Sequence, residues 1–327
     1  MASVLVTGGA GYIGSHAAWA LADDGRRVIV LDDLSTGDRA NIPPDAAFVH
    51  GSVADEALVT RVLDEHDVRL VMHFAGSISV PESVESPLKY YVNNTAGSLA
   101  LIGASSRRGA HLVFSSTAAV YAPQAGGVLS EASALDPLSP YGRSKLMTER
   151  MLQDVHAAGG AAHAILRYFN VAGADPQGRT GQSTPEATHL LKIACQTALG
   201  LRPSLPIYGR DYDTPDGACV RDYIHVSDLA QAHLEAARHL ESGGEAVTLN
   251  CGYGRGASVL EVVSALERVT GRPLPFHDAQ RRPGDAPFVV ADNRAIRQTL
   301  PGWAPRFAEL DRIVEDALRW ERRIAGR

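Results

Sequence analysis

The sequence predicts an α/β fold built on a parallel sheet with helices on both faces. Short apolar segments rich in Val, Ile and Leu alternate with amphipathic segments through the first half of the chain. Nearly continuous apolar strands are typical of parallel sheets buried on both sides, and parallel strands need a helical crossover between them. Beyond residue 173 the segments become shorter and less regular. We therefore expect a large α/β domain and a smaller, mixed α/β C-terminal domain.

Six segments are expected to form the strands of the main sheet. Each is rich in β-branched residues and is bounded by polar or turn-forming residues. In chain order they are 3–7 (SVLVT), 27–32 (RVIVLD), 47–50 (AFVH), 70–74 (LVMHF), 111–116 (HLVFSS) and 163–167 (HAILR). Helical periodicity follows the first and third of them, at 13–25 and 55–66.

A change in composition suggests where the first domain ends. Residues 173–186 (GADPQGRTGQSTPE) are rich in Gly, Pro, Asp and Thr, which favours a loop. We expect the first domain to span 1–172 and the second to span 173–327. The segment 222–250 contains a helical pattern at 226–240 and is expected to return to the first domain.

Composition and charge limit the class of protein. The 327 residues include 31 Lys and Arg against 37 Asp and Glu, scattered along the chain, so no nucleic-acid partner is expected. No stretch approaches about 18 uninterrupted apolar residues, and no signal peptide is apparent, so neither membrane insertion nor secretion is expected. The three cysteines are widely spaced and form no CxxC pair, which favours a reduced, cytoplasmic protein without a metal site.

A glycine-rich segment follows the first expected strand. In TGGAGYIG, Gly8, Gly11 and Gly14 lie between that strand and the start of a helix. Glycines there permit a tight turn and a close approach of the backbone to a pyrophosphate, and the helix N-terminus offers free N–H groups to phosphates. The pattern predicts a Rossmann-type doubly wound sheet that binds a dinucleotide.

An acidic pair ends the second expected strand. Asp32, followed by Asp33, stands where a carboxylate accepts hydrogen bonds from the adenosine ribose and repels a 2′-phosphate. This favours NAD over NADP. The alternative interpretation of the same sequence pattern is a structural glycine turn with a surface aspartate. In HFAG, after the fourth strand, Ala75 and Gly76 leave room for a cofactor, and His73 has no suitably spaced second metal ligand, so a packing role is favoured.

A tyrosine and a lysine share one helical face in SPYGRSK. Tyr141 and Lys145 are four residues apart, and a hydroxyl-rich strand end that includes Thr117 precedes them. A free tyrosine titrates near about pH 10, too high for a base at neutral pH. A neighbouring ammonium and an oxidised nicotinamide would both favour the phenolate. Lys145 can also hold the nicotinamide ribose, and Thr117 can bond a substrate oxygen, although the spacing alone also fits an ordinary helical pair.

Nine motifs, in order, resemble those of the extended short-chain dehydrogenase/reductases. They are TGGAGYIGSH, LDDLSTG, HFAG, YYVNNTAGSL, FSSTAAVY, SPYGRSK, LRYFN, VRDYIHVSDLA and RRPGD, spread over nearly the whole chain. More narrowly, the chain is similar to the UDP-hexose 4-epimerases of that family. The resemblance implies reversible 4-epimerisation of UDP-galactose and UDP-glucose through a 4-keto intermediate, with tightly bound NAD. It also implies a homodimer formed by the helices at 88–104 and 142–158.

The matched motifs imply roles for individual residues. The catalytic residues would be Tyr141, Lys145 and Thr117. The NAD-binding residues would be Gly8, Gly11, Tyr12, Ile13, Gly14, Asp32, Asp33, Phe74, Ala75, Gly76, Asn93, Ser115, Tyr141, Lys145 and Tyr168. The residues that bind the UDP-sugar would be Thr117, Tyr141, Phe169, Asn170, His189, Leu190, Pro206, Ile207, Tyr208, Arg221, Arg282, Asp285 and Val289. Tyr208 would face the uracil, and the two arginines would clamp the diphosphate.

Two alanines separate this chain from the nucleotide-sugar 4,6-dehydratases. Those relatives carry Asp-Glu after the strand-end threonine, whereas Ala118 and Ala119 stand here. Elimination of water needs an acid and a base at those positions. Without them the chemistry should stop at oxidation and reduction of the sugar C4.

Other positions leave the sugar open. Val289 falls where relatives restricted to glucose and galactose carry a tyrosine, so it would leave space for an N-acetyl group, although a register slip onto Phe288 would reverse this inference. Ser52 replaces an aspartate of many relatives, which would weaken adenine recognition. Ile78 replaces a lysine of some relatives, which would remove one cation from the diphosphate site. The alternatives are the same mechanism on UDP-N-acetylglucosamine, a UDP-pentose or UDP-glucuronate, and a non-catalytic NAD-sensing protein, which would usually have lost the tyrosine or the lysine.

Overall fold

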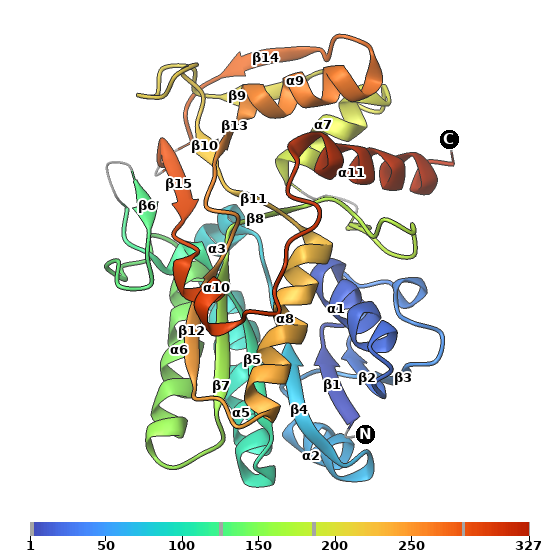
Figure 1. Ribbon diagram of the computed structural model, residues 1–327, viewed down its shortest axis with the longest axis vertical. Coiled ribbons are helices and arrows are strands. Elements are labelled where there is room, and N and C mark those ends of the chain that lie inside the picture. Colours follow the sequence, from blue (N-terminus) through green and yellow to red (C-terminus); the bar gives the residue numbers. More distant parts are fainter. Residues whose placement is uncertain (1–2, 124–126, 185–187, 283–284, 327) are drawn as a thin grey trace.

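A parallel β-sheet forms the larger lobe of the molecule, below the smaller lobe in Figure 1. The computed structural model describes residues 3–123, 127–184, 188–282 and 285–326, and within these ranges the sheet has seven strands. Their order is β12-β7-β5-β4-β1-β2-β3, and every neighbouring pair is parallel. The strands are β1 Ser3–Thr7, β2 Val28–Asp32, β3 Ala47–His50, β4 Val68–His73, β5 His111–Thr117, β7 His163–Tyr168 and β12 Val247–Cys251.

The predicted doubly wound α/β fold is confirmed. The strands β2 and β3 lie on one side of β1, and β4, β5, β7 and β12 lie on the other. The direction in which strands are added to the sheet therefore reverses between β1 and β4. Helices cover both faces. One face packs on α1 (Tyr12–Asp23) and α8 (Val226–Glu241), and the other on α2 (Glu56–Glu65), α5 (Gly97–Arg108) and α6 (Pro140–Ala157).

Alternate residues of β1 pack into two separate cores. Val4 and Val6 of β1 lie in the core on the α1 and α8 side, whereas Leu5 lies in the core on the α2, α5 and α6 side. The strand β4 begins two residues before the expected segment. Arg69 interrupts the apolar run in the sequence, but its side chain is exposed while its backbone continues the strand.

The segment 222–250 contributes to the large sheet. The helix α8 packs against α1, and β12 pairs with β7 through Val247 and Ala164 to form an edge of the sheet. A strand β8 (Asn170–Ala172) pairs with β11 (Tyr223–His225) immediately before α8. The two chain segments thus lie side by side where the lobes meet.

The smaller lobe is built on a second, four-stranded sheet within the described residues. Its strand order is β13-β10-β15-β6, and β9 pairs separately with β14. The strand β6 belongs to the first 172 residues, yet it pairs with β15. The sheet of the smaller lobe therefore includes a short strand from the first half of the chain. The strands are β6 Val128–Leu129, β9 Leu205–Tyr208, β10 Val220–Arg221, β13 Ala257–Ser258, β14 Phe276–Ala279 and β15 Phe288–Ala291.

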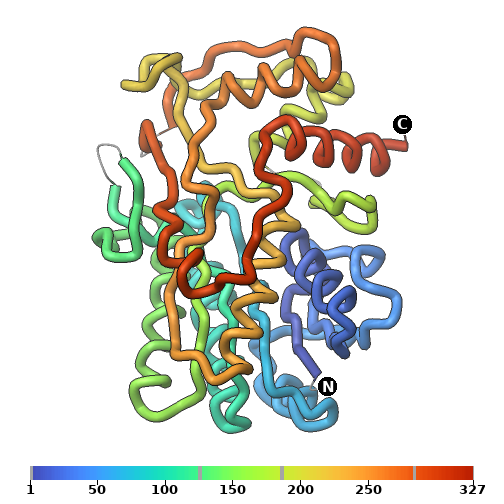
Figure 2. Tube along the Cα trace, viewed as in Figure 1, coloured from blue at the N-terminus to red at the C-terminus, as the bar shows by residue number. Residues whose placement is uncertain are grey.

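Helices complete the smaller lobe and link it to the larger one. Figure 2 shows the chain after β15 running down beside β12 and returning to the upper lobe. The helices of this part are α7 Leu190–Ala198, α9 Val259–Thr270, α10 Arg294–Thr299 and α11 Leu310–Ile324. Shorter turns on the larger lobe are η1 Arg39–Asn41, α3 Val80–Glu85, α4 Pro87–Tyr90, η2 Tyr91–Ala96 and η3 Ala118–Val120. In the described part of the chain, every helix lacks the length and apolar run needed to cross a bilayer.

Candidate active site

The glycine-rich turn lies where the strand order reverses, between the carboxyl ends of β1 and β4. Gly8 has φ of +68°, and a Cβ atom on it would lie 2.5 Å from the backbone nitrogen of Ala75. A Cβ on Gly14 would lie 2.2 Å from the Gly8 carbonyl oxygen. Gly11 precedes α1 without a side-chain cap, so the first N–H groups of that helix have no side-chain partner from this residue. Only glycines permit this close packing, and the turn presents backbone N–H groups where an anion fits.

Asp32 is held against this turn. Its carboxylate is 8% exposed and accepts hydrogen bonds from the backbone N–H groups of Ala10 (2.9 Å) and Leu34 (2.8 Å). Burial raises the pKa of Asp32, and these two bonds act in the opposite direction. Asp33 points away and accepts instead from the backbone N–H and hydroxyl of Ser35. Of the two predicted carboxylates, Asp32 is the one beside the cradle.

The end of β4 forms the opposite wall of the cradle. The Phe74 ring packs at a tilt against the ring of His233, with 4.7 Å between the ring centres. Gly76 lies so close to Asn94 that a Cβ on it would be 3.0 Å from the Asn94 Oδ1. Asn94 is buried; its Oδ1 accepts from the Ser77 backbone N–H and its Nδ2 donates to the Ser77 carbonyl. Asn93, the residue that we predicted, is exposed and donates to the Ser77 hydroxyl. Asn94 therefore shapes this wall, while Asn93 keeps its amide at the surface.

His73 is a buried structural residue in this structure. Its Nδ1 is 2.7 Å from the hydroxyl of Thr7 and its Nε2 is 2.8 Å from the hydroxyl of Ser98. Burial is the main cause that lowers the pKa of His73 to about 3, and the charge of Lys145 adds to it. The ring is therefore neutral at physiological pH, with both nitrogens engaged.

The reactive side chains meet at the end of β5. Helix α6 begins at Pro140, where the Ser139 hydroxyl accepts a hydrogen bond from the backbone of Gly142. Tyr141 is 7% exposed, and its hydroxyl is hydrogen-bonded to Thr117. Lys145 is 3% exposed, and its Nζ donates to the Ser115 carbonyl at 3.0 Å.

Burial sets the pKa of Tyr141 in the protein without a bound cofactor. In the protein alone, burial raises the pKa of Tyr141, and the Thr117 bond only partly opposes this effect. The Lys145 ammonium is directed at the Ser115 carbonyl and lies 4.9 Å from the centre of the Phe114 ring. Burial also lowers the pKa of Lys145 to about 8. A phenolate at neutral pH thus needs positive charge from a bound group as well as from Lys145.

Gly142 lets α6 approach the turn η3 closely. A Cβ on Gly142 would lie 2.3 Å from the Ala119 carbonyl oxygen. Ala118 and Ala119 make up most of η3, directly after Thr117. The position at which dehydratases carry ionisable groups is therefore next to the reactive tyrosine, and here it offers only methyl groups.

Three further predicted residues lie at the ends of β7 and β8. The Ser115 hydroxyl donates to the Tyr168 hydroxyl at 2.8 Å, and burial raises the pKa of Tyr168. Phe169 is buried in a small apolar cluster with Val120. Asn170 is exposed, and its backbone N–H is bonded to the Asp222 carbonyl. The side-chain amide of Asn170 is free to face a ligand between the lobes.

The second lobe places its predicted residues in two groups. On β9, the Ile207 side chain is buried, whereas the ring of Tyr208 is covered by the Arg282 guanidinium at 4.0 Å. Arg221 on β10 is paired with Asp285 at 2.5 Å, and it lies opposite Val289 in the β10–β15 register. Pro206, on β9, is half-buried and lies opposite His277 in the β9–β14 register. Residues 283 and 284 of the RRPGD motif lie outside the described residues.

His189 and Leu190 lie at the start of α7. His189 is exposed, and its Nδ1 is 2.7 Å from the Gln182 amide nitrogen. Leu190 is half-buried and packs against the main core. These residues face the larger lobe. Within the described ranges, the structure records no bond between them and the groups around Tyr208 and Arg221.

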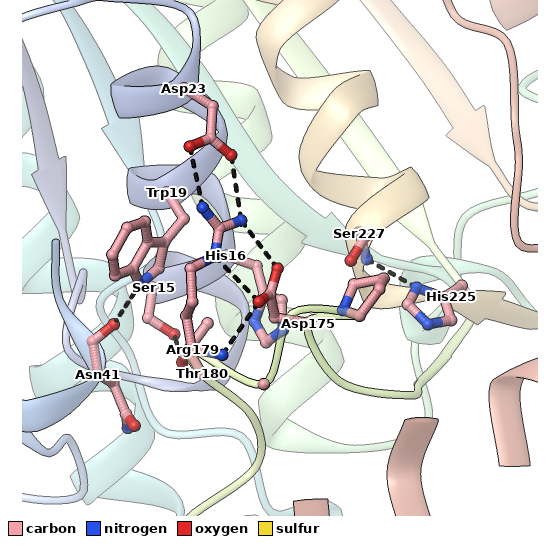
Figure 3. Close-up of polar contacts among 12 residues, drawn as sticks. Ser15, His16, Trp19, Asp23, Asn41, Asp175, Arg179, Thr180, His225 and Ser227 are labelled. Atoms are coloured by element: carbon pink, nitrogen blue, oxygen red, sulfur yellow. Dashed lines mark hydrogen bonds and ion pairs between the residues drawn. The ribbon is translucent and has the colours of Figure 1, made fainter. Parts of the chain in front are cut away.

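A polar clasp ties the linking loop to the cofactor helix (Figure 3). The Arg179 guanidinium is paired with Asp23 of α1 at 2.9 Å and with Asp175 at 2.9 Å, and it stacks on Trp19 at 4.3 Å. The Ser15 and Thr180 hydroxyls are 2.7 Å apart. The Tyr12 hydroxyl donates to the Gly173 carbonyl at 2.7 Å. The loop 173–186, which begins the second lobe, is thus anchored beside the glycine turn. Its residues 185 and 186 lie outside the described ranges.

Sequence reasoning missed several buried residues around the reactive helix. They are Asn94, Ser116, Glu149 and Arg167. One signal was available for Glu149, which follows Lys145 by the same four-residue step that separates Lys145 from Tyr141. The contacts of Ser116 and Arg167 depend on the pairing of β5 with β7, and those of Asn94 join separate elements, which the sequence did not reveal.

A tyrosine–lysine helix beside a dinucleotide cradle is the arrangement of the short-chain dehydrogenase/reductase class. Comparison with known proteins narrows this class. The chain belongs to the NAD dependent epimerase/dehydratase family, whose model matches residues 4–252.

Several relatives and solved structures similar to this chain are 4-epimerases. The UDP-glucose 4-epimerase of Azospirillum brasilense is 58% identical over 323 residues, covering 98% of this chain and 92% of the relative. The crystal structure of UDP-glucose 4-epimerase from Brucella ovis in complex with NAD is 41% identical, with a TM-score of 0.94 and 98% of each chain covered. The UDP-Glc/GlcNAc 4-epimerase from Campylobacter jejuni is 41% identical, with a TM-score of 0.86 and 99% and 100% covered.

Proposed function

We propose that the protein is an NAD-dependent UDP-hexose 4-epimerase that interconverts UDP-galactose and UDP-glucose. One observation carries the proposal: the hydroxyl of buried Tyr141 is bonded to Thr117 beside Lys145, and only alanines follow at 118 and 119. This arrangement supports proton transfer at a sugar hydroxyl and provides no catalyst for elimination. The full-length similarity to UDP-glucose 4-epimerases supports the choice of a UDP-hexose.

The residues around the glycine turn fit NAD. A Cβ at Gly8 or Gly14 would collide with the backbone that forms the turn. Asp32 stands where its carboxylate would accept hydrogen bonds from the adenosine ribose and would repel a 2′-phosphate. The pyrophosphate would lie on the N-terminus of α1, with Tyr12 and Ile13 beside it. The chemistry that NAD supplies when bound is acceptance of a hydride from the sugar C4 and its return to the opposite face.

The side chains at the end of β5 would move the proton. Tyr141 takes the proton from the sugar 4-hydroxyl and later gives it back, and Thr117 bonds the same oxygen and holds it in place. Lys145 uses one of its three N–H donors on the Ser115 carbonyl, so two remain for the nicotinamide ribose and for the charge on Tyr141. Tyr168 and Phe169, at the end of β7, would flank the nicotinamide.

The second lobe would anchor the UDP group. Tyr208 offers an aromatic face to uracil, and its other face carries Arg282. Arg221 and Arg282 suit a diphosphate because a guanidinium bonds phosphate oxygens in pairs. Asp285 would take a ribose hydroxyl. Anchoring the nucleotide strongly and the sugar weakly allows the ketose to turn over between the two hydride transfers. The backbone of β9 at Pro206 and Ile207, together with Asn170, His189 and Leu190, would complete this site.

Val289 supports a second substrate pair, the UDP-N-acetylhexosamines. It is half-buried and packs against the cluster that contains Phe169, opposite Arg221. A valine leaves more room there than an aromatic side chain. The related enzyme from Campylobacter jejuni is described as a UDP-Glc/GlcNAc 4-epimerase.

An exposed apolar stripe supports a homodimer. Leu88, Val92 and Leu99, from α4 to α5, are 75%, 65% and 58% exposed, and Met147 on the adjacent α6 is 44% exposed. Large apolar side chains gathered in this way are typical of a contact surface. We propose that two copies pack these helices together as a four-helix bundle. Three free, buried cysteines fit a reducing, cytoplasmic location.

A proton NMR time course tests the proposed function. The purified protein is incubated separately with UDP-galactose and with UDP-N-acetylgalactosamine, first without added NAD and then with it. We expect new anomeric signals from the glucose epimer without added cofactor, and none from the Tyr141→Phe variant. Conversion of UDP-galactose alone would remove the N-acetyl proposal. Absence of any turnover with NAD present would contradict the assignment of a UDP-hexose substrate and point to pentose or uronate nucleotides.

A further inference from the structure

Glu149 lies on the reactive face of α6 and is fully buried. It follows Lys145 by four residues, as Lys145 follows Tyr141, so the three side chains form one stripe along the helix. A buried carboxylate is strongly unfavourable unless it is paired and hydrogen-bonded. The proposed chemistry does not use this residue, so its burial needs a reason.

Strand alternation brings two partners to Glu149. Leu112 and Phe114 of β5, and Ile165 of β7, belong to the core on the α6 side, so Ser116 and Arg167 point the same way. These two residues are also opposite each other in the β5–β7 register. The neighbouring Ser115 and Tyr168 point to the other face and bond each other there.

Both partners bond the carboxylate. The Ser116 hydroxyl donates to Glu149 Oε1, and the Arg167 guanidinium donates through Nε to Oε1 at 3.0 Å and through Nη2 to Oε2 at 2.6 Å. Arg167 also donates to the Tyr121 hydroxyl at 3.1 Å, and Tyr121 in turn donates to Asn250 on β12 at 2.6 Å. The helix is thereby fastened to three strands of the sheet.

Two bonds of opposite direction connect α6 to successive residues of β5. Lys145 Nζ donates to the Ser115 carbonyl, and Ser116 donates to Glu149. One bond has its donor on the helix and the other has its donor on the strand. A rotation or slide of α6 that moved Lys145 away from Ser115 would also break the Glu149 bond, so the two bonds hold the lysine in one place.

Glu149 also acts on the charge of Lys145. Burial lowers the pKa of Lys145 to about 8, and the negative charge of Glu149 opposes that effect. The other titratable groups around the Tyr141–Lys145 pair are Tyr90 on α4, His73 at the end of β4, and Arg167 and Tyr168 on β7. Glu149 is the negatively charged group that acts on the pKa of Lys145.

We propose that the Glu149–Arg167 pair positions Lys145: Glu149 holds the lysine over Ser115 and keeps its ammonium protonated, and Arg167 neutralises the buried carboxylate. The proposal rests on the role given above to Lys145 in the proposed function. Glu149 touches neither substrate nor cofactor in this scheme; it acts through the lysine.

Lysine NMR tests the proposal without any substrate. The chain contains three lysines, Lys89, Lys145 and Lys192, so lysine labelled with ¹³C at Cε gives three signals to follow with pH. A Lys89→Arg variant assigns the exposed one. The titration is compared between the wild type, Glu149→Gln, the double variant Glu149→Gln/Arg167→Met, and Glu321→Gln. Glu321 forms a buried pair with Lys192 in the second lobe and serves as the matched control.

The double variant separates positioning from folding. Loss of one partner leaves an unpaired buried charge, whereas replacing both partners with neutral side chains often restores stability. We expect the double variant to recover most of the melting temperature that Glu149→Gln loses. Its Lys145 pKa should still lie about one unit below the wild-type value, because the nearby anion is gone. Glu321→Gln should leave the Lys145 titration unchanged.

The activity of the same variants completes the test. We expect kcat for UDP-galactose to fall at least tenfold in the double variant, with its alkaline limb moved to lower pH and KM nearly unchanged. A double variant with wild-type Lys145 titration and wild-type kcat would overturn the proposal. If the wild type itself shows no turnover, the proposed function fails, but the lysine titration still decides the positioning role.

Discussion

The Tyr141 hydroxyl, carried by α6, is hydrogen-bonded to Thr117 at the carboxyl end of β5. Removing the tyrosine hydroxyl removes the group proposed to transfer the proton. We expect Tyr141→Phe to lower kcat by roughly 100-fold to 10,000-fold. Thr117→Ser should retain most activity because it keeps the hydroxyl, whereas Thr117→Val should lose it. The measurement is kcat for UDP-galactose, and equal rates for the serine and valine variants would contradict the role of Thr117.

The glycine cradle predicts a loss of cofactor. Gly14→Ala would place a Cβ 2.2 Å from the Gly8 carbonyl, so the turn must shift and the NAD site with it. We expect the purified variant to carry little NAD, measured by absorbance after denaturation. Gly103→Ala is the control, since a Cβ there meets only the end of the Arg107 side chain at 3.6 Å. This exchange should stabilise α5 by about 0.5–1 kcal/mol and keep NAD.

Buried neutral histidines predict sensitivity to acid. Burial lowers the pKa of His16 and His233 to about 4 and that of His73 to about 3. The unfolded chain binds these protons near about pH 6.5, so the stability is fully present above that pH and declines as the pH falls toward the folded values. We expect the free energy of unfolding to fall by up to about 1.4 kcal/mol per histidine per pH unit below pH 6.

A single variant checks the histidine prediction. His233→Phe keeps an aromatic ring against Phe74 and removes one of these protons. Chemical denaturation at pH 7, 6 and 5 should give a shallower loss of stability for this variant than for the wild type. The same slope in both proteins would show that His233 is not involved.

The small side chain of Val289 predicts a change in sugar specificity on substitution. Val289→Tyr adds a ring opposite Arg221, so we expect loss of activity on UDP-N-acetylgalactosamine with activity on UDP-galactose retained. Phe288→Tyr, at the adjacent position of β15, is the control and should change neither substrate strongly. If Phe288→Tyr, rather than Val289→Tyr, excluded the N-acetyl sugar, the register of the specificity position would be wrong.

The clasp in Figure 3 predicts that Arg179 matters more than an exposed arginine with similar partners. Arg179 pairs with buried Asp175 and stacks on Trp19, so Arg179→Ala leaves a buried carboxylate unpaired and should cost about 1–3 kcal/mol. Arg281 pairs with exposed Asp211 and stacks on Tyr212 at 4.2 Å, so Arg281→Ala should change the melting temperature little. Equal shifts for both variants would contradict this prediction.

The parallel sheet, the glycine turn and the tyrosine–lysine helix could be predicted because each depends on residues close together in the sequence. Periodicity marks a strand or a helix within about ten residues, and the turn at Gly8 needs only its own glycines. The strand β6 could not be predicted, because two residues carry no periodicity and its partner β15 is far away in the chain. Asn94 was missed for a related reason, since its bonds to Ser77 and Ser144 join separate elements.

The sequence by itself determined which chemistry the protein can carry: Asp32 beside a glycine turn, a tyrosine four residues before a lysine, and two alanines where an elimination would need an acid and a base. The tertiary structure alone decided how those groups are charged and held. The pKa values of Tyr141 and Lys145 depend on burial, and burial depends on every element packed around them. Glu149 joins that group only because the register of β5 and β7 brings Ser116 and Arg167 to it, and strand register is set by packing rather than by local sequence.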